Sequence, residues 1–187
     1  MDKNKKEIRI ITGIAKNRRL KAPEIEGFRA VQEIAKSSLF SILGDKIRDS
    51  VCLDLFSGSG NLGIEALSRG AKWCDFVDEN PQSVSIIKDN VFKCGFGEIS
   101  EVIRKEAAKY VVNSSRYYDV VFMDPFYEDI SQKYLILNLE NILNEDGLIV
   151  YFHGENLDLD SLLKETNFKV KDERKFGKSI FSILSFK

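Results

Sequence analysis

The tetrapeptide Asp124-Pro125-Phe126-Tyr127 follows an apolar run, residues 118–123, and contains groups suited to chemistry on a nucleobase. An exocyclic amine is a weak nucleophile because its lone pair is delocalised into the ring, so an enzyme that modifies it must turn that lone pair out of the ring plane. The Asp124 carboxylate and the Pro125 carbonyl could each accept one N–H of such an amine. The fixed φ of proline would keep the carbonyl aimed, and the attack needs no metal.

The aromatic side chain of Tyr127 could hold the base by stacking, a contact worth about 1 to 3 kcal/mol in nucleic-acid grooves. Because a stacked base hides its edge, the target would have to be flipped out or already unpaired. The plainer alternative is that Asp124-Pro125 only turns the chain after a buried strand.

A glycine-rich turn, Ser57-Gly58-Ser59-Gly60, is the second candidate site. It follows the mostly apolar residues 51–55 and opens into residues 62–67, whose apolar spacing is helical. Glycines let backbone amides approach a ligand closely, and the helix that follows offers unpaired N–H groups and the positive end of its dipole. This arrangement predicts a nucleotide-binding corner.

The acids around this corner indicate which nucleotide it binds. The spacing Gly58-x-Gly60-x-x-Gly63 also fits the dinucleotide fingerprint, with Asp78 about 20 residues further on, so NAD stays an alternative. Asp54 lies before the glycines and could meet a cationic ligand, whereas a dinucleotide strand usually runs apolar into its first glycine. The pattern D-x-F-x-G-x-G, from Asp54 through Phe56 to Gly60, resembles the first motif of S-adenosylmethionine-dependent methyltransferases.

Two further acids follow predicted strands and could complete a cofactor site. Asp78 ends the strand predicted over residues 73–77, where it could accept hydrogen bonds from both ribose hydroxyls of an adenosine. Glu106 follows the strand predicted over residues 101–104 and could accept a bond from the adenine amine. An acid in a charged loop is common, so Glu106 also fits an ordinary surface residue.

Alternating strands and helices must position these groups, and they predict a mostly parallel α/β sheet. A helix over residues 31–43 would turn Gln32, Glu33, Lys36 and Ser37 to solvent. A helix from Tyr134 would carry Ile142 and Leu143 and end through a turn at 145–147. The other predicted strands are 51–55, 118–123 and 148–152, the other helices 81–91 and 157–164, and the closing hairpin 168–176 with 179–186.

Composition limits the class of protein. The chain has 187 residues, of which 43% are hydrophobic, and this suits one compact domain. No apolar run reaches the roughly 18 residues of a membrane span, and the first residues lack the apolar core of a signal peptide, so we expect a cytoplasmic protein without a membrane partner. Cys52, Cys74 and Cys94 are widely spaced and His153 is the only histidine, which argues against a metal site.

Charge is distributed unevenly, although the net charge is only −1. The first 21 residues carry eight basic residues, Arg18 and Arg19 among them, against two acids, a local +6 that leaves −7 on the remainder. A basic segment on an acidic body fits an arm that contacts phosphates. The alternative is a solvated tail.

The whole chain resembles the RsmD-type bacterial methyltransferases, which modify the exocyclic N2 of a guanine in small-subunit (16S) ribosomal RNA. The most specific matching segment runs from Asp54 to Gly70, and the match includes Arg9-Ile10-Ile11-x-Gly13, Arg18-Arg19-Leu20, Arg29, Leu39-Phe40, Val77-Asp78, Asn90, Glu106, Asp124-Pro125 and the Gly177 hairpin. The resemblance implies a seven-stranded Rossmann-like class I fold with an antiparallel C-terminal hairpin. Residues 1–28 would form a basic arm or hairpin, and residues 29–187 the methyltransferase domain.

The resemblance also implies a role for each matching residue. Asp54, Phe56, Ser57, Gly58, Gly60, Asp78 and Glu106 would bind S-adenosylmethionine; Asp124, Pro125 and Tyr127 would be catalytic; Arg18, Arg19, Arg29 and Phe126 would contact the RNA. The chain departs from the family pattern where Phe126 replaces a second proline, and in residues 29–37, where only Arg29, Glu33 and loosely Lys36 match. The expected partner is ribosomal RNA, within a small-subunit assembly particle, and the expected state is a monomer.

Other functions remain open at this point. An amine methyltransferase acting on DNA adenine or protein glutamine would use a similar acceptor loop, although no separate target-recognition domain is evident. A catalytically impaired RNA-binding protein would keep the cofactor pocket. An NAD-dependent oxidoreductase is the more distant alternative.

Overall fold

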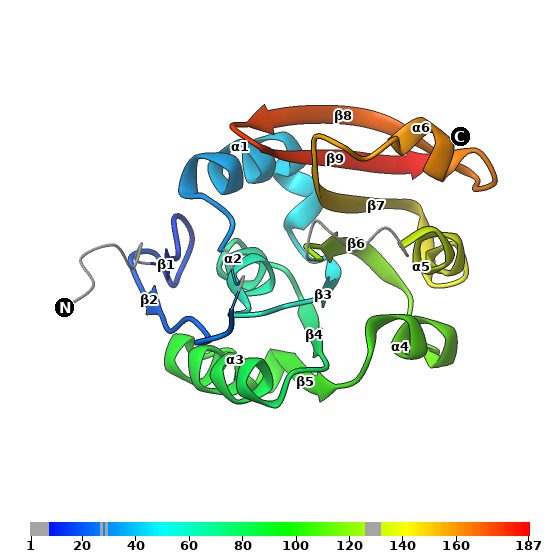
Figure 1. The fold of residues 1–187 in the computed structure, drawn as a ribbon. Coiled ribbons are helices and arrows are strands. Elements are labelled where there is room, and N and C mark those ends of the chain that lie inside the picture. Colours follow the sequence, from blue (N-terminus) through cyan, green and yellow to red (C-terminus); the bar gives the residue numbers. More distant parts are fainter. Residues whose placement is uncertain (1–7, 27, 29, 126–131) are drawn as a thin grey trace.

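The fold is built on a seven-stranded sheet with the order β5-β4-β3-β6-β7-β9-β8 (Figure 1). The computed structural model describes residues 8–26, 28, 30–125 and 132–187. Neighbouring strands from β5 to β7 run parallel, whereas β9 is antiparallel to both β7 and β8. The strands are β3 Val51–Leu55, β4 Trp73–Asp78, β5 Ser100–Arg104, β6 Tyr118–Met123, β7 Leu143–Gly154, β8 Phe168–Phe176 and β9 Ser179–Phe186. The predicted sheet and its terminal hairpin are confirmed.

Helices cover both faces of the sheet because side chains of each strand alternate between two cores. In β3, Cys52 belongs to the core under α1, α2 and α3, while Leu53 and Leu55 belong to the core under α4, α5 and α6. The helices are α1 Glu33–Leu43, α2 Asn61–Ser68, α3 Pro81–Cys94, α4 Ala107–Asn113, α5 Gln132–Leu139 and α6 Leu159–Leu163, with short 3-10 turns η1 Gly44–Ile47 and η2 Gly97–Ile99.

The N-terminal hairpin packs on this framework. Its strands β1, Ile8–Arg9, and β2, Arg19–Leu20, pair antiparallel as a separate two-stranded sheet. Ile8 and Leu20 are buried in the core that α1, α2 and α3 share. Figure 1 shows the hairpin beside α2, and the backbone N–H of Ile14 donates to the carbonyl of Ser68 at 2.9 Å.

Hairpin packing explains one wrong prediction, the exposed position of Lys36. This side chain is only 1% exposed, and its Nζ donates to the Arg9 carbonyl at 2.7 Å and to Asn61 Oδ1 at 2.6 Å. The stripe of α1 is therefore rotated relative to the prediction, and Ile42 is 38% exposed. The covering segment lies far from α1 in the sequence, so the spacing of apolar residues within α1 could not reveal it.

The second wrong prediction concerns residues 142–147. Helix α5 ends at Leu139, and Leu143 already belongs to β7, where it pairs with Tyr118 of β6. The next pair is Val120 with Leu148, so two residues along β6 correspond to five residues along β7, and the register shifts between these pairs. The expected turn at 145–147 is thus an irregularity within one strand.

Candidate active site

The order of the parallel strands brings the predicted site residues to one edge of the sheet. Strand β3 lies between β4 and β6, so their carboxyl ends are neighbours. Asp78 ends β4, the glycine-rich turn follows β3, and Asp124 follows β6. Ligands of open α/β sheets bind in the crevice outside the carboxyl ends of the strands.

Asp54 is the most deeply buried acid of this edge, with 2% of its surface exposed. Its Oδ2 accepts a hydrogen bond from the backbone N–H of Gly63 at 2.9 Å. Burial holds the pKa of Asp54 well above its usual value, and the carboxylates of Asp124 and Asp78 raise that pKa further. Asp78 and Asp124 therefore lie close enough to Asp54 to affect its charge.

Asp78 supports the glycine-rich turn directly. One carboxylate oxygen accepts the N–H of Gly58 at 2.8 Å, and the other accepts the N–H of Asn80 at 2.9 Å. Burial raises the pKa of Asp78, and these two hydrogen bonds oppose the rise. Each carboxylate oxygen can accept more than one hydrogen bond, so both retain capacity for ribose hydroxyls.

The turn itself is conformationally unusual. Gly58 and Gly60 have φ of +56° and +76°, and Phe56 has φ of +56°, a region that bulky residues rarely adopt. The hydroxyl of Ser57 donates to the carbonyl of Asp54 and ties the turn to the end of β3. Strained backbone of this kind clusters at ligand sites, where the surrounding structure maintains it.

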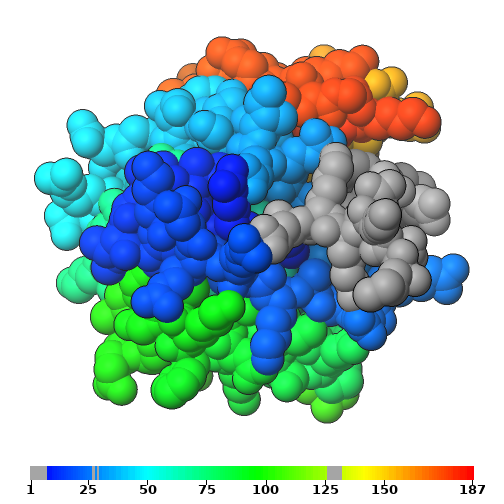
Figure 2. Space-filling view, turned by 90° about the vertical axis from the view of Figure 1, so that its left-hand side faces the viewer, coloured from blue at the N-terminus to red at the C-terminus, as the bar shows by residue number. Residues whose placement is uncertain are grey.

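Phe28 is a residue near this turn that sequence analysis missed. A Cβ atom placed on Gly58 would lie 2.7 Å from the Phe28 ring, so the ring packs directly on the glycine. Phe28 comes from the irregular segment between β2 and α1, where no periodic pattern marks it. In Figure 2 the N-terminal residues, in blue, lie between α1 above and α3 below.

Asn61, the first residue of α2, is a second missed residue. Its Oδ1 accepts from Lys36 Nζ, which sets the orientation of the amide, and its buried Nδ2 has no hydrogen-bond partner. Asn61 also lines a pocket of about 300 Å³, together with Arg9, Val31 and Lys36 among others. An unpaired buried donor next to a glycine-rich turn fits a ligand that has an acceptor such as a carboxylate.

These observations fit S-adenosylmethionine. Asp54 is a buried acid whose charge a cationic sulfonium could relieve, Asp78 keeps acceptor capacity for ribose hydroxyls, and Asn61 has an unpaired donor that a carboxylate could accept. Among the described residues, neither Asp54 nor Asp78 forms an ion pair with a basic side chain.

Asp124 is half-buried at the end of β6, and Pro125 beside it is buried. Burial raises the pKa of Asp124 to about 7. A carboxyl group with this pKa can change its protonation state near neutral pH, as a general base must. The other two residues of the predicted acceptor loop, Phe126 and Tyr127, lie outside the described residues.

Of the remaining predicted site residues, Glu106 lies at the same edge of the sheet as the three acids, because the N–H of Lys105 beside it donates to the Asp78 carbonyl at 3.1 Å. Glu106 immediately precedes α4, and its Oε2 lies 2.6 Å from Lys109 Nζ. Arg18 and Arg19 are exposed on the hairpin on the side of α3, where Lys93 Nζ donates to the Arg19 carbonyl at 2.7 Å. Arg29 lies outside the described residues, and the RNA roles of these arginines stay predictions.

Comparison with solved structures defines the class of protein. A proposed methyltransferase from Escherichia coli superimposes with a TM-score of 0.85 at 26% identity, covering 97% of this chain and 98% of that chain. A proposed methylase from Haemophilus influenzae gives a TM-score of 0.79 at 27% identity, covering 95% and 97%. The fold, with its glycine-rich turn and acids at the strand ends, is that of the class I methyltransferases.

Sequence comparison then defines the family. The family model described as Conserved hypothetical protein 95 matches residues 8–185. Ribosomal RNA small subunit methyltransferase D of Haemophilus influenzae is 35% identical over 156 residues, covering 81% of this chain and 80% of that protein. The Escherichia coli protein of the same name is 31% identical over 151 residues, covering 80% and 75%. The chain belongs to this family, the RsmD-type methyltransferases, and the predicted resemblance is confirmed.

One further property concerns membranes. Within the described part of the chain, no helix combines the length and the apolar character that crossing a bilayer requires.

Proposed function

We propose that this protein transfers the methyl group of S-adenosylmethionine to the exocyclic N2 amine of a guanine in small-subunit ribosomal RNA. The observation that carries the proposal is the position of Asp124, at the end of β6 and within electrostatic reach of Asp54 beside the glycine-rich turn. The names of the relatives, ribosomal RNA small subunit methyltransferase D, support this substrate.

The bound cofactor supplies an electrophilic methyl group on a sulfonium. Asp54 and Asp78 would hold that cofactor at the ends of β3 and β4. Asp124 in its ionised form accepts one N–H of the guanine amine, and the Pro125 carbonyl accepts the other, so that the nitrogen lone pair faces the methyl carbon. This nitrogen would take the methyl group from the cofactor, which would keep the electron pair of the broken C–S bond, and Asp124 or water would accept the proton that the nitrogen loses.

The test is direct labelling. Purified protein is incubated with tritiated S-adenosylmethionine and small-subunit particles from a strain that lacks this activity, and the labelled nucleotide is mapped. We expect label on N2 of one guanine. Label on DNA adenine or on a protein glutamine instead, or binding of NAD without S-adenosylhomocysteine in calorimetry, would overturn the assignment.

Asp124→Ala separates chemistry from binding in the same assay. We expect it to reduce methyl transfer by about 10²- to 10⁴-fold, the usual contribution of a positioned acid or base, with S-adenosylhomocysteine affinity within a few fold of the original. Asp78→Ala should chiefly weaken cofactor binding. Full activity of Asp124→Ala would show that the acceptor role is wrong.

A further inference from the structure

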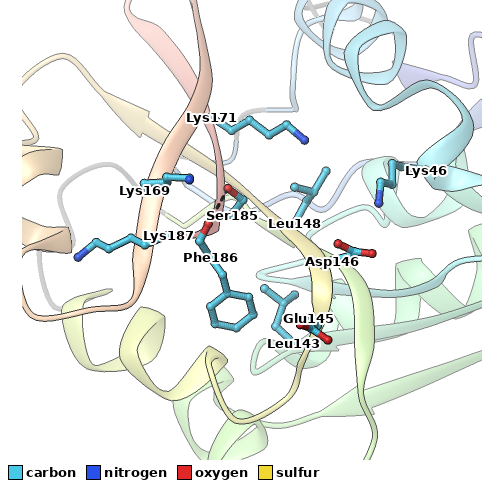
Figure 3. Close-up of a pocket in the computed structure, with 11 residues that line it drawn as sticks. Lys46, Leu143, Glu145, Asp146, Leu148, Lys169, Lys171, Ser185, Phe186 and Lys187 are labelled. Carbon is cyan, nitrogen blue, oxygen red and sulfur yellow. Dashed lines mark hydrogen bonds between the residues drawn. The ribbon is translucent and has the colours of Figure 1, made fainter.

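A second pocket, of about 940 Å³, lies at the opposite edge of the sheet from the candidate active site. Its lining comes from η1, the start of β7, β8 and the end of β9 (Figure 3). Leu143 in this lining pairs with Tyr118, the first residue of β6, whereas Asp124 follows the last residue of β6. At about 3.3 Å per residue, the length of β6 separates the two places by about 20 Å.

Three lysines from two different elements line this pocket. Lys46 comes from η1, and Lys169 and Lys171 come from β8; all three are exposed and line the pocket. In Figure 3, Lys46 and Lys171 extend over the pocket from opposite sides. None of the three forms an ion pair with a described residue. Lys187 differs, because its Nζ already donates to the Thr166 carbonyl at 2.7 Å.

This arrangement attracts an anion, and the acidic residues of the pocket indicate which kind. The lysines of the lining outnumber Glu145 and Asp146, so the pocket is net positive, and a hollow of positive potential is the signature of a phosphate contact. Glu145 and Asp146 line the same pocket, and a carboxylate accepts hydrogen bonds from hydroxyl groups. Among nucleic acids only RNA offers a 2′-hydroxyl donor next to each phosphate, so the mixed lining fits an RNA backbone better than a DNA backbone.

We propose that this pocket binds the backbone of an RNA segment distant from the methylated nucleotide, with Lys46, Lys169 and Lys171 on successive phosphates and Asp146 on a ribose hydroxyl. The proposal rests on the proposed function for the identity of the RNA, and it specifies the kind of substrate. A folded RNA reaches both edges of the sheet at once, whereas a short stem-loop reaches only the active site.

The test compares two variants that lose the same three charges. In one, Lys46, Lys169 and Lys171 are changed to Gln; in the control, Lys72, Lys88 and Lys164, which are exposed and lie outside the pocket, are changed to Gln. Binding to a folded small-subunit ribosomal RNA fragment is measured by fluorescence anisotropy over a range of salt concentrations. The pocket variant should bind about tenfold more weakly at low salt, with a log–log salt slope shallower by about 3, one unit for each lost phosphate contact. The control variant should resemble the original protein.

Further measurements show whether the lost lysines act on RNA bound at the pocket or on the active site. Methyl transfer to a short stem-loop that carries the target guanine should be unchanged in the pocket variant, while KM for the long RNA rises. Asp146→Ala should reduce the preference for the RNA fragment over DNA of the same sequence. An unchanged Kd in the pocket variant, or an equal loss in the control, would overturn the proposal. So would normal binding to naked RNA combined with lost activity on assembled particles, because the pocket would then contact a protein.

The labelling and binding experiments can fail independently, so failure of the pocket proposal is distinguishable from failure of the proposed function. If the original protein methylates no RNA, the proposed function fails, and the difference in binding between the two lysine variants still decides whether the pocket binds RNA. If methylation is mapped as expected and both variants bind equally, only the pocket proposal fails.

Discussion

Two groups of buried charges lie close to the two ends of helix α2, and they differ in how their charge is balanced. Glu65 is fully buried, and its carboxylate lies 3.1 Å from Lys36 Nζ and 2.8 Å from Arg69 Nε. The same carboxylate accepts the backbone N–H groups of Ile11 and Thr12 at 2.8 and 3.0 Å. This group is complete in itself, and it ties the N-terminal hairpin to α1 and α2.

The second group consists of Asp54, Asp78 and Asp124. Here burial raises the pKa of each acid, and the charges of Asp78 and Asp124 raise that of Asp54 further. Within the described residues no ion pair with a basic side chain offsets them. A balanced group destabilises the fold when one partner is removed, whereas an unbalanced group is itself destabilising until a cation binds. The difference supports the proposal that the acids of the strand edge hold the cofactor.

The largest expected effect comes from breaking the balanced group. Glu65→Ala leaves Lys36 buried without its counter-charge, so the free energy of unfolding should fall by about 3 to 5 kcal/mol in urea denaturation. The control is Glu33→Ala, which breaks the exposed pair with Arg9 and should cost no more than about 1 kcal/mol. Equal effects of the two substitutions would show that Glu65 is not the centre of a structural cluster.

Neutralising one acid of the unbalanced group should not lower the free energy of unfolding, in contrast to Glu65→Ala. Asp54→Asn keeps an acceptor for Gly63 but removes the charge, so the cofactor-free protein should be at least as stable as the original at pH 8, while affinity for S-adenosylmethionine falls by about 10- to 100-fold. Calorimetry measures the binding and urea denaturation the stability.

Asp75 provides the matched control for Asp54. It is also buried, but it accepts hydrogen bonds from the Tyr118 hydroxyl at 2.6 Å, Trp73 Nε1 at 2.7 Å and Arg116 Nη1 at 3.0 Å. Asp75→Asn should therefore destabilise the protein and leave the cofactor affinity nearly unchanged. A destabilised Asp54→Asn protein with normal affinity would remove the distinction between the two groups.

Raising the pH should move activity and stability in opposite directions. Because the pKa of folded Asp124 is about 7 and that of an unfolded Asp is about 3.9, this residue favours the folded state below pH 4 and loses that contribution as the pH rises to about 7. Methyl transfer needs the ionised form, so kcat/KM at pH 6 should be about tenfold below its plateau above pH 8. Asp124→Asn should flatten the stability profile, and an unchanged profile would contradict the assignment.

The smallest expected effect concerns the contact between Gly58 and Phe28. Gly58→Ala adds a Cβ that meets the Phe28 ring at 2.7 Å at a φ of +56°, so we expect a loss of about 1 to 3 kcal/mol in stability and weaker cofactor binding. Gly95→Ala controls for backbone strain alone, because Gly95 also has positive φ, +82°, with no atom within 4 Å of the added Cβ. If the two variants bind the cofactor equally, the Phe28 contact has no part in the site.

The sequence by itself determined the sheet, the closing hairpin and the positions of Asp54, Asp78 and Asp124 at strand ends. Strand and helix periods are local, and in a parallel sheet a polar residue that follows a buried strand lies at the carboxyl edge whatever covers the sheet. The helix predicted over residues 81–91 likewise begins where α3 begins, after the cap that Asn80 forms. Local patterns were therefore sufficient for the framework of the site.

Only the tertiary structure decided what covers that framework. Lys36 is buried because the hairpin, about 20 residues earlier in the chain, packs on its face of α1, and Phe28 lies on Gly58 for a similar reason. The pocket with Lys46, Lys169 and Lys171 joins segments more than 100 residues apart. Contacts between distant segments depend on how whole elements pack, and the spacing of residues within one element contains no information about them.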